Sequence, residues 1–116
     1  MKVAIVGSRG LKVSHLENYL PPDVTEIVSG GARGIDAAAR DYAQKAGIPL
    51  VEYLPDYRRY GRAAPLRRNL LIVQHCDLLL AFWDGKSRGT RCVVDCCKRM
   101  GVPFRLFRAK GETVEG

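Results

Sequence analysis

The sequence predicts an α/β domain in which helices cover both faces of a parallel sheet. Short apolar runs alternate with helical patterns along the chain, the order that strand–helix–strand units produce. With 116 residues the chain is long enough for one domain, expected at residues 1–108, followed by a polar, frayed tail at 109–116. The runs expected to form strands are 2–6, 25–28, 49–54, 77–83 and 103–107.

The first two helices are predicted by their boundary residues and their spacing. Ser14 and Glu17 form a capping-box pattern, and the helix that follows must stop at Pro21. Its apolar face would carry Leu16, Tyr19 and Leu20. The second helix has apolar residues at helical spacing from Ile35 to Ala46, then Gly47 as a left-handed cap.

Two further helices are expected in the second half of the chain. Pro65 suits the first turn of the third helix, and Thr90 is expected to cap the fourth, which ends before Gly101. Their core faces are expected at Leu66, Leu70 and Val73 in the third helix and at Val93, Cys96, Cys97 and Met100 in the fourth.

Composition favours a cytoplasmic protein with a phosphate-bearing partner. The net charge is +7, which suits either a nucleic acid or a small nucleotide. No apolar run is long enough to span a bilayer, and no export signal follows Met1, so no membrane partner is expected. Four cysteines lie in or beside apolar segments, without metal-site spacing, so neither a disulfide framework nor a metal is expected; they are Cys76, Cys92, Cys96 and Cys97.

Three strand-to-helix junctions are rich in glycine and basic residues. They read "GSRG" (7–10), "SGGARGID" (29–36) and "WDGKSRGT" (83–90). In a parallel sheet these turns emerge at one edge, where open α/β folds bind ligands. Glycine tolerates positive φ and lets backbone N–H groups approach an anion, and the following helix N-terminus attracts phosphate. We therefore predict one shared anion site.

The residues predicted to bind the ligand come from these turns and from the start of the third helix. Arg33 would add a guanidinium, and Asp36 would accept a hydrogen bond from a hydroxyl such as that of a ribose. The full set is Gly7, Ser8, Arg9, Ser29, Gly30, Gly31, Ala32, Arg33, Gly34, Asp36, Arg68, Asn69, Asp84, Gly85, Ser87, Gly89 and Thr90.

The segment 55–69 is strongly basic and allows two interpretations. It holds Arg58, Arg59, Arg62, Arg67 and Arg68 together with Tyr57 and Tyr60. It could be a rim that clamps phosphates and stacks a base, or simply a solvated basic loop. The glycine-rich turns themselves support neither a dinucleotide-binding dehydrogenase nor a P-loop NTPase. The "GSRG" turn lacks the third glycine of a dinucleotide site, and Leu80 stands where a P-loop needs glycine.

Four ordered motifs carry a family resemblance: "VGSR", "VSGGARGID", "PLRRN" and "AFWDGKSRGT". They are similar to those of the SLOG superfamily, which includes the DprA (SMF) DNA-processing proteins and the LOG-type nucleotide phosphoribohydrolases, and above all to its small YspA-like branch. The resemblance covers residues 2–107. It implies a Rossmann-like three-layer sandwich with a five-stranded parallel sheet of order 3-2-1-4-5, a nucleotide site built by these loops, and a homodimer or higher homo-oligomer.

The sequence departs from the LOG-type pattern at one position that matters for catalysis. Those hydrolases carry a glutamate two or three residues after the turn that ends here at Thr90, whereas this chain has Cys92 and Val93. Neither side chain can act as that carboxylate. Asp84, Asp36 and Asp95 are the carboxylates that could substitute, although Asp95 lies on the helix body and Asp84 is also a typical turn former; Asp84 and Arg68 are taken as the candidate catalytic residues. The favoured hypothesis is therefore a sensor or sequestering module for a nucleotide-derived small molecule that needs no cofactor. A LOG-like N-glycosidic hydrolase and a DprA-like binder of single-stranded DNA are the alternatives.

Overall fold

The computed structural model describes the chain apart from residues 9, 14, 32–33, 109–112 and 116. It contains one sheet with the strand order β3-β2-β1-β4-β5-β6. The first five strands are parallel in the predicted order 3-2-1-4-5, and β6 runs antiparallel to β5. The strands are β1 (Lys2–Gly7), β2 (Glu26–Ser29), β3 (Leu50–Glu52), β4 (Leu78–Phe82), β5 (Phe104–Phe107) and β6 (Thr113–Glu115). The fold is Rossmann-like, as predicted.

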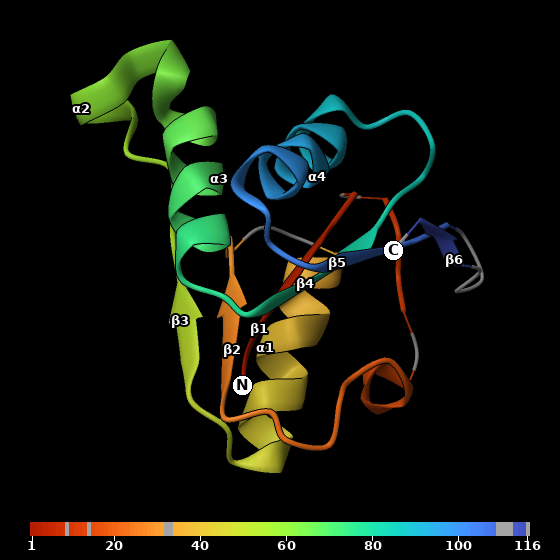
Figure 1. Ribbon diagram of the computed structural model, residues 1–116. Coiled ribbons are helices and arrows are strands. Elements are labelled where there is room, and N and C mark those ends of the chain that lie inside the picture. The colour runs from red at the N-terminus through yellow and green to blue at the C-terminus, as the bar shows by residue number, and fades with distance from the viewer. Residues whose placement is uncertain (9, 14, 32–33, 109–112, 116) are drawn as a thin grey trace.

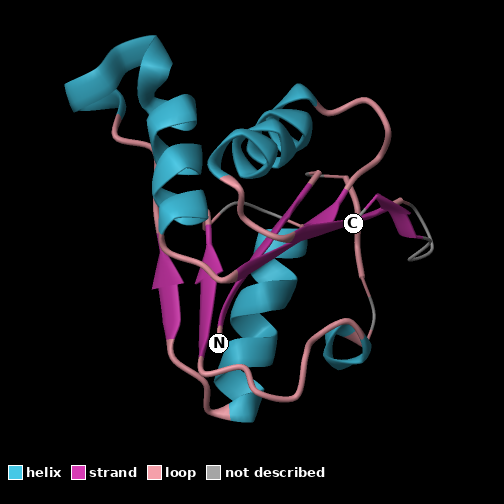
Figure 2. Cartoon of the chain, viewed as in Figure 1, coloured by secondary structure: helices cyan, strands magenta, loops and turns pink. Residues whose placement is uncertain are grey.

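Helices cover both faces of the sheet (Figure 1 and Figure 2). On one face lies α1 (Ile35–Ala46), and on the other lie α3 (Ala64–Gln74) and α4 (Arg88–Met100). Three short elements complete the chain: the 3-10 turn η1 (Leu16–Asn18), helix α2 (Tyr57–Tyr60) and the 3-10 turn η2 (Gly61–Ala63). Among the described residues, none of the helices combines the length and apolar character needed to cross a bilayer.

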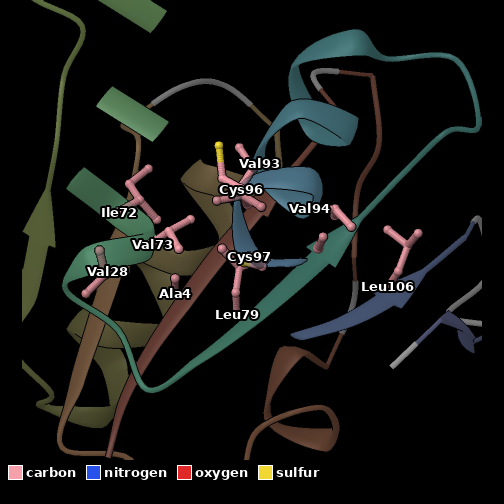
Figure 3. Close-up of a cluster of buried hydrophobic side chains, with 12 residues drawn as sticks. Ala4, Val28, Ile72, Val73, Leu79, Val93, Val94, Cys96, Cys97 and Leu106 are labelled. Carbon is pink, nitrogen blue, oxygen red and sulfur yellow. The ribbon is translucent and has the colours of Figure 1, made fainter. Parts of the chain in front are cut away.

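Two hydrophobic clusters fill the two layers because successive side chains of a strand point to opposite faces. In β1, Val3 and Ile5 pack on the α1 side, whereas Ala4 and Val6 pack on the side of α3 and α4. The central strand β4 is buried along its whole length, as expected for a parallel strand covered on both faces. Figure 3 shows the cluster beneath α3 and α4.

The cysteines are free thiols, and two of them belong to this core. Cys96 and Cys97 are buried on α4, as predicted, and both are labelled in Figure 3. Burial raises the pKa of Cys97 to about 12 and that of Cys76 to about 11, so both thiols stay protonated at neutral pH. Within the described residues, no group of three or more metal-binding side chains gathers in one place.

The prediction for the first helix is wrong in extent. Only the three-residue turn η1 forms, and His15, which precedes it, has a left-handed backbone with φ of 56°. A residue in that conformation cannot form the first turn of an α-helix, so the predicted helix cannot begin at His15. The predicted apolar residues Leu16, Tyr19 and Leu20 still pack in the α1 layer, and the predicted capping residue Ser14 lies outside the described residues.

Details of the third and fourth helices also differ from the prediction. The cap of α4 is Ser87, not Thr90: the Ser87 Oγ accepts a hydrogen bond from the Thr90 amide at 3.3 Å. The expected core residues Leu66 and Met100 are 44% and 40% exposed. In α3 the expected core residues Val73 and Leu70 do pack in the cluster beneath the helix, and Ala64, Asn69 and Ile72 are buried beside them.

The polar tail, expected to fray, contributes a sixth strand instead. Thr113–Glu115 pairs antiparallel with Leu106 and Phe107 of β5. Backbone pairing at an exposed sheet edge needs no apolar pattern, because the unpaired N–H and C=O groups of the edge strand supply the bonds. For this reason the composition of the tail gave no sign of the strand.

Candidate functional site

A cleft of about 700 Å³ opens at the carboxyl edge of the sheet. It lies where the strand order reverses, since β1 has β2 on one side and β4 on the other. The three glycine-rich turns and α3 all contribute to its walls. Its lining residues are Val6, Gly7, Gly10, Gly30, Gly31, Asp36, Leu54, Pro55, Tyr57, Pro65, Arg68, Asn69, Ile72, Asp84, Ser87, Gly89, Thr90 and Val93.

Gly7 lets α1 begin directly above β1. A Cβ at this position would fall closer to the Ile35 side chain, and to the Phe82 carbonyl oxygen, than real Cβ atoms approach. The absence of a side chain therefore serves the packing of the helix against the strand. Because that packing fixes the first turn of α1, Gly7 shapes the cleft floor indirectly.

Ser8 ties the first turn to the third. The side chain is almost fully buried, at 2% exposure, and its amide donates to the Phe82 carbonyl at 2.9 Å. Its Oγ accepts a hydrogen bond from the Asp84 amide at 3.1 Å and lies 3.4 Å from the Thr90 Oγ1. The turns after β1 and β4 are thus held together by buried polar contacts between residues far apart in the sequence.

Asp84 builds the turn that leads into α4. Its Oδ1 accepts hydrogen bonds from the amides of Lys86 at 2.8 Å and Ser87 at 2.7 Å. These two bonds, that of Lys86 first, hold the pKa of the exposed Asp84 carboxyl below its usual value. Ser87 then caps α4 through the Thr90 amide.

The start of α4 leaves two backbone donors without a protein acceptor. The amides of Thr90 and Arg91 bond to Ser87, whereas within the described part of the chain the amides of Arg88 and Gly89 make no hydrogen bond. Gly89 lines the cleft. Unpaired N–H groups and the helix dipole together make this end of α4 attractive to an anion.

The second turn is held open by glycines and supported by Ser29. The Ser29 Oγ, fully buried, accepts a hydrogen bond from the Gly31 amide at 3.2 Å. Gly31 and Gly34 have φ of 72° and 74°, which favours glycine at both positions. Asp36 follows in the first turn of α1, where the helix dipole stabilises its carboxylate. Asp36 also lines the cleft, although it is only 5% exposed.

Arg68 connects α3 to the second turn. Its Nη1 donates to the Gly30 carbonyl at 3.1 Å, and its Nε donates to the Asn69 Oδ1 at 3.0 Å. A Cβ on Gly30 would meet this guanidinium and would lie 3.3 Å from an Asp36 carboxylate oxygen. The side chains of Asp36, Arg68 and buried Asn69 therefore gather around Gly30 on the cleft floor.

The structure brings together most, but not all, of the predicted site. Ser8, Ser29, Gly34 and Gly85 support the turns without lining the cleft, and three predicted residues, Arg9, Ala32 and Arg33, lie outside the described residues. Sequence reasoning placed neither Leu54 nor Val93 in the site. Leu54 is 65% exposed on the β3 side of the cleft, beside Tyr57 at 60% exposure. Leu54 follows β3 and directly precedes Pro55, and this position at a strand end is the sequence signal that could have placed it at the cleft.

A doubly wound parallel sheet with glycine-rich turns around a cleft at its switch point defines a Rossmann-like ligand-binding domain. A family model described as "YspA, cpYpsA-related SLOG family" matches residues 1–60, which hold the first two glycine-rich turns. The Gene 61 protein of Mycobacterium phage D29 is 33% identical over 90 residues, 72% of each chain. The chain belongs to the YspA, cpYpsA-related SLOG family. No solved structure gives a significant match.

Proposed function

We propose that this protein binds a nucleotide or a nucleotide-derived small molecule in the cleft, as a sensor or a sequestering protein. The observation that carries the proposal is that turns after three different strands, together with α3, line a single cleft. Membership of the SLOG family is consistent with a nucleotide-related ligand. A volume of about 700 Å³ lies within the usual range for small-molecule sites.

In this proposal the start of α4 binds a phosphate group. The unpaired amides of Arg88 and Gly89 lie next to the hydroxyls of Ser87 and Thr90, which also line the cleft. A helix of 13 residues supplies a full dipole, and nearby Lys86 adds positive charge. The two amides and the Ser87 hydroxyl can donate hydrogen bonds to one phosphate, while the Thr90 hydroxyl donates to the Ser87 Oγ at 3.3 Å.

The remaining walls suit the other parts of a nucleotide. Asp36 and Asn69 offer buried oxygen acceptors on the cleft floor, which fits the hydroxyls of a sugar. Leu54, Pro55 and Tyr57 form an apolar wall on the β3 side, against which a base can pack. The expected ligand therefore extends from α4, across the floor, toward β3.

Three features favour binding without turnover. The Asp84 carboxyl, a candidate catalytic group, has a lowered pKa, and one of its oxygens bonds two backbone amides. A general acid or base works best with a pKa near the working pH. Val93, one of the two positions at which LOG-type hydrolases carry glutamate, presents an isopropyl group to the cleft. Arg68 holds the second turn in place through its bond to Gly30.

The test is calorimetry with nucleoside mono- and diphosphates, ADP-ribose and cyclic dinucleotides. At least one is expected to bind, and Arg88→Pro should weaken it about tenfold more than Arg88→Ala, because only proline also removes the amide donor. Ser87 has φ of −62° and ψ of 120°, a conformation that suits a following proline at the first helical position. If no compound binds the folded protein, or both variants bind equally well, the proposed site is wrong.

The resemblance and the composition extend the proposal in two respects. We place the protein in the cytoplasm, because its free thiols suit a reducing compartment. As the resemblance implies, it assembles as a homodimer, which light scattering tests against a chain mass of 12.9 kDa.

A further inference from the structure

The side-chain amide of Asn69 has a fixed orientation on the floor of the cleft. Its Oδ1 accepts a hydrogen bond from the Arg68 Nε at 3.0 Å. A guanidinium only donates hydrogen bonds, so the end of the amide that faces it must be the oxygen and not the nitrogen. The Asn69 Nδ2 therefore lies on the other side of the amide group, with two hydrogens to donate.

The protein itself does not use this donor. Asn69 is 5% exposed and lines the cleft. Within the described part of the chain its Nδ2 makes no hydrogen bond, whereas the side-chain nitrogens shut off from solvent all have a partner there. The Nδ2 is therefore accessible from the cleft. A buried polar side chain that leaves a donor unused requires an explanation, because an apolar side chain would fill the same volume without that cost.

Arg68 prevents the amide from turning over, because it is itself held at a second point. Its Nη1 donates to the Gly30 carbonyl at 3.1 Å, which fixes the guanidinium between α3 and the turn after β2. A rotation of the Asn69 amide by 180° would place one donor against another, the Nδ2 against the Arg68 Nε. The amide therefore presents its donor to the cleft before any ligand arrives, and its orientation costs no entropy on binding.

A carboxylate acceptor lies on the same floor. A Cβ on Gly30 would be 2.6 Å from the Arg68 Nη1 and 3.3 Å from an Asp36 carboxylate oxygen, so both side chains border the same small space. Asp36 also lines the cleft. A carboxylate has about four lone-pair positions, so it can accept a hydrogen bond from a ligand in addition to any from the protein. The floor thus combines a fixed donor with an acceptor.

We propose that Asn69 and Asp36 bind the two neighbouring hydroxyls of a ribose, and that the cleft selects ribonucleotides over deoxyribonucleotides. This inference rests on the proposed function, which places the sugar of a nucleotide on this floor. One hydroxyl donates to the Asp36 carboxylate, and the other accepts from the Asn69 Nδ2. A vicinal diol fits both residues because each hydroxyl can either donate or accept.

The inference separates nucleotides that share the same phosphate chemistry. A ribonucleoside 5′-monophosphate and ADP-ribose both have a free 2′,3′-diol. A 3′,5′-linked cyclic dinucleotide has none, because each 3′ oxygen is esterified. Compounds with the free diol should therefore bind, and the cyclic dinucleotides should bind at least about tenfold more weakly, since a buried polar group is then left unpaired.

The first experiment uses the wild-type protein alone. Calorimetry compares the ribonucleoside 5′-monophosphates of the four common bases with their 2′-deoxy and 3′-deoxy analogues, each of which lacks one hydroxyl and keeps the base and the phosphate. The loss of either hydroxyl is expected to weaken binding about tenfold. This comparison does not depend on the folding of any variant.

The second experiment assigns one hydroxyl to its residue with Asn69→Ala. The penalty for one of the two deoxy analogues should fall to within about twofold, because that hydroxyl no longer has a donor to meet. The penalty for the other analogue, whose hydroxyl Asp36 binds, should stay about tenfold. Each penalty is a ratio measured within one variant, so a general loss of affinity cancels.

The matched control is Asn18→Ala, the same change at an exposed residue of η1, and it should leave both penalties as they are in wild type. Urea unfolding establishes that each variant is folded. If Asn69→Ala unfolds, Asn69→Leu serves the same comparison, because leucine keeps nearly the volume of asparagine and also lacks the donor.

Three outcomes would overturn the inference and leave the proposed function standing. In the first, either deoxy analogue binds wild type as tightly as the ribonucleotide. In the second, a cyclic dinucleotide binds although no compound with a free diol does. In the third, the Asn69 variant leaves both penalties unchanged or removes both, so that Asn69 does not serve one hydroxyl. If no compound binds the folded wild type, the proposed function fails and the inference fails with it.

Discussion

Glycines in the turns serve two separate purposes at the level of single residues. Gly31 has positive φ, so it provides a backbone conformation that other residues rarely adopt. Gly7 instead provides space, because Ile35 of α1 and the Phe82 carbonyl occupy the volume that a side chain would need. The sequence indicates the position of both glycines but does not reveal which purpose each one serves.

Replacing Gly7 with alanine is therefore expected to destabilise the fold. Overpacking against Ile35 should lower the free energy of unfolding by about 1–3 kcal/mol. Gly10→Ala is the matched control, because a Cβ there meets no atom within 4 Å, and its effect should stay within about 0.5 kcal/mol. Urea unfolding of both variants checks the prediction, which equal effects would contradict.

Asp84 should contribute stability that depends on pH. Its folded-state pKa is lowered by the amides of Lys86 and Ser87, so the contribution is present above its unfolded pKa of about 4 and is lost as the pH falls through the lower folded value. Asp84→Asn keeps an oxygen acceptor but loses the charge. Wild type should be more stable than this variant at pH 7, and the difference should shrink toward pH 3. Urea midpoints measure it, and a difference that is constant with pH would refute the assignment.

The sequence predicted that the three turns lie at one edge of the sheet, but it predicted the structural role of each residue within them less well. Strand ends in a parallel sheet share an edge, which is why Gly30, Asp36 and Gly89 were placed together correctly. Ser87 was not identified as the cap of α4, since both Ser87 and Thr90 are good capping residues and only the observed backbone distinguishes them. Leu54 was missed because its exposure depends on how the chain leaves β3.

At the level of elements, one side chain of α3 positions the turn between β2 and α1. Arg68 spans from α3 to the Gly30 carbonyl, 38 residues earlier in the chain, and also bonds Asn69. The second turn therefore depends on α3 as well as on its own glycines. This arrangement needs the full reach of arginine, which a lysine could not reproduce with two directed donors.

Arg68→Ala is expected to lower the free energy of unfolding by about 1–3 kcal/mol, because it leaves partly buried acceptors on Gly30 and Asn69 without their donor. Arg67→Ala, the exposed neighbour, should change it by less than about 0.5 kcal/mol. Chemical denaturation monitored by circular dichroism compares the two. Similar losses in both variants would show that Arg68 does not anchor the turn.

The helices and strands whose apolar residues form continuous runs or recur at helical spacing were predicted well. Those whose extent depends on local backbone conformation or tertiary contacts were predicted less well. The five parallel strands and α1 follow from continuous apolar runs and a helical repeat that ends in Gly47. The first helix failed because the backbone at His15 is left-handed, which its spacing pattern does not show. In α3, Leu70 and Val73 pack as expected, whereas Leu66 is exposed and the polar Asn69 is buried beside the cleft, which an apolar repeat does not indicate.

For the whole molecule, β6 protects one border of the sheet. Without it, the backbone groups of Leu106 and Phe107 that pair with Thr113–Glu115 would form an open edge. A chain ending at residue 108 keeps the five parallel strands and the cleft. We expect it to fold with a free energy of unfolding about 1–2 kcal/mol lower and with more self-association. Urea unfolding and light scattering test this, and a shortened chain that equals wild type in both would contradict it.

The bond between the Ser8 hydroxyl and the Asp84 amide spans 76 residues. During synthesis on the ribosome, the chain up to β3 already contains the first two turns, but Arg68, which bonds the second turn, and the third turn emerge later. The cleft therefore forms only when β4 inserts beside β1. A ligand that contacts all three turns can thus bind only after β4 and the start of α4 have joined the sheet, so the first half of the chain cannot bind it alone.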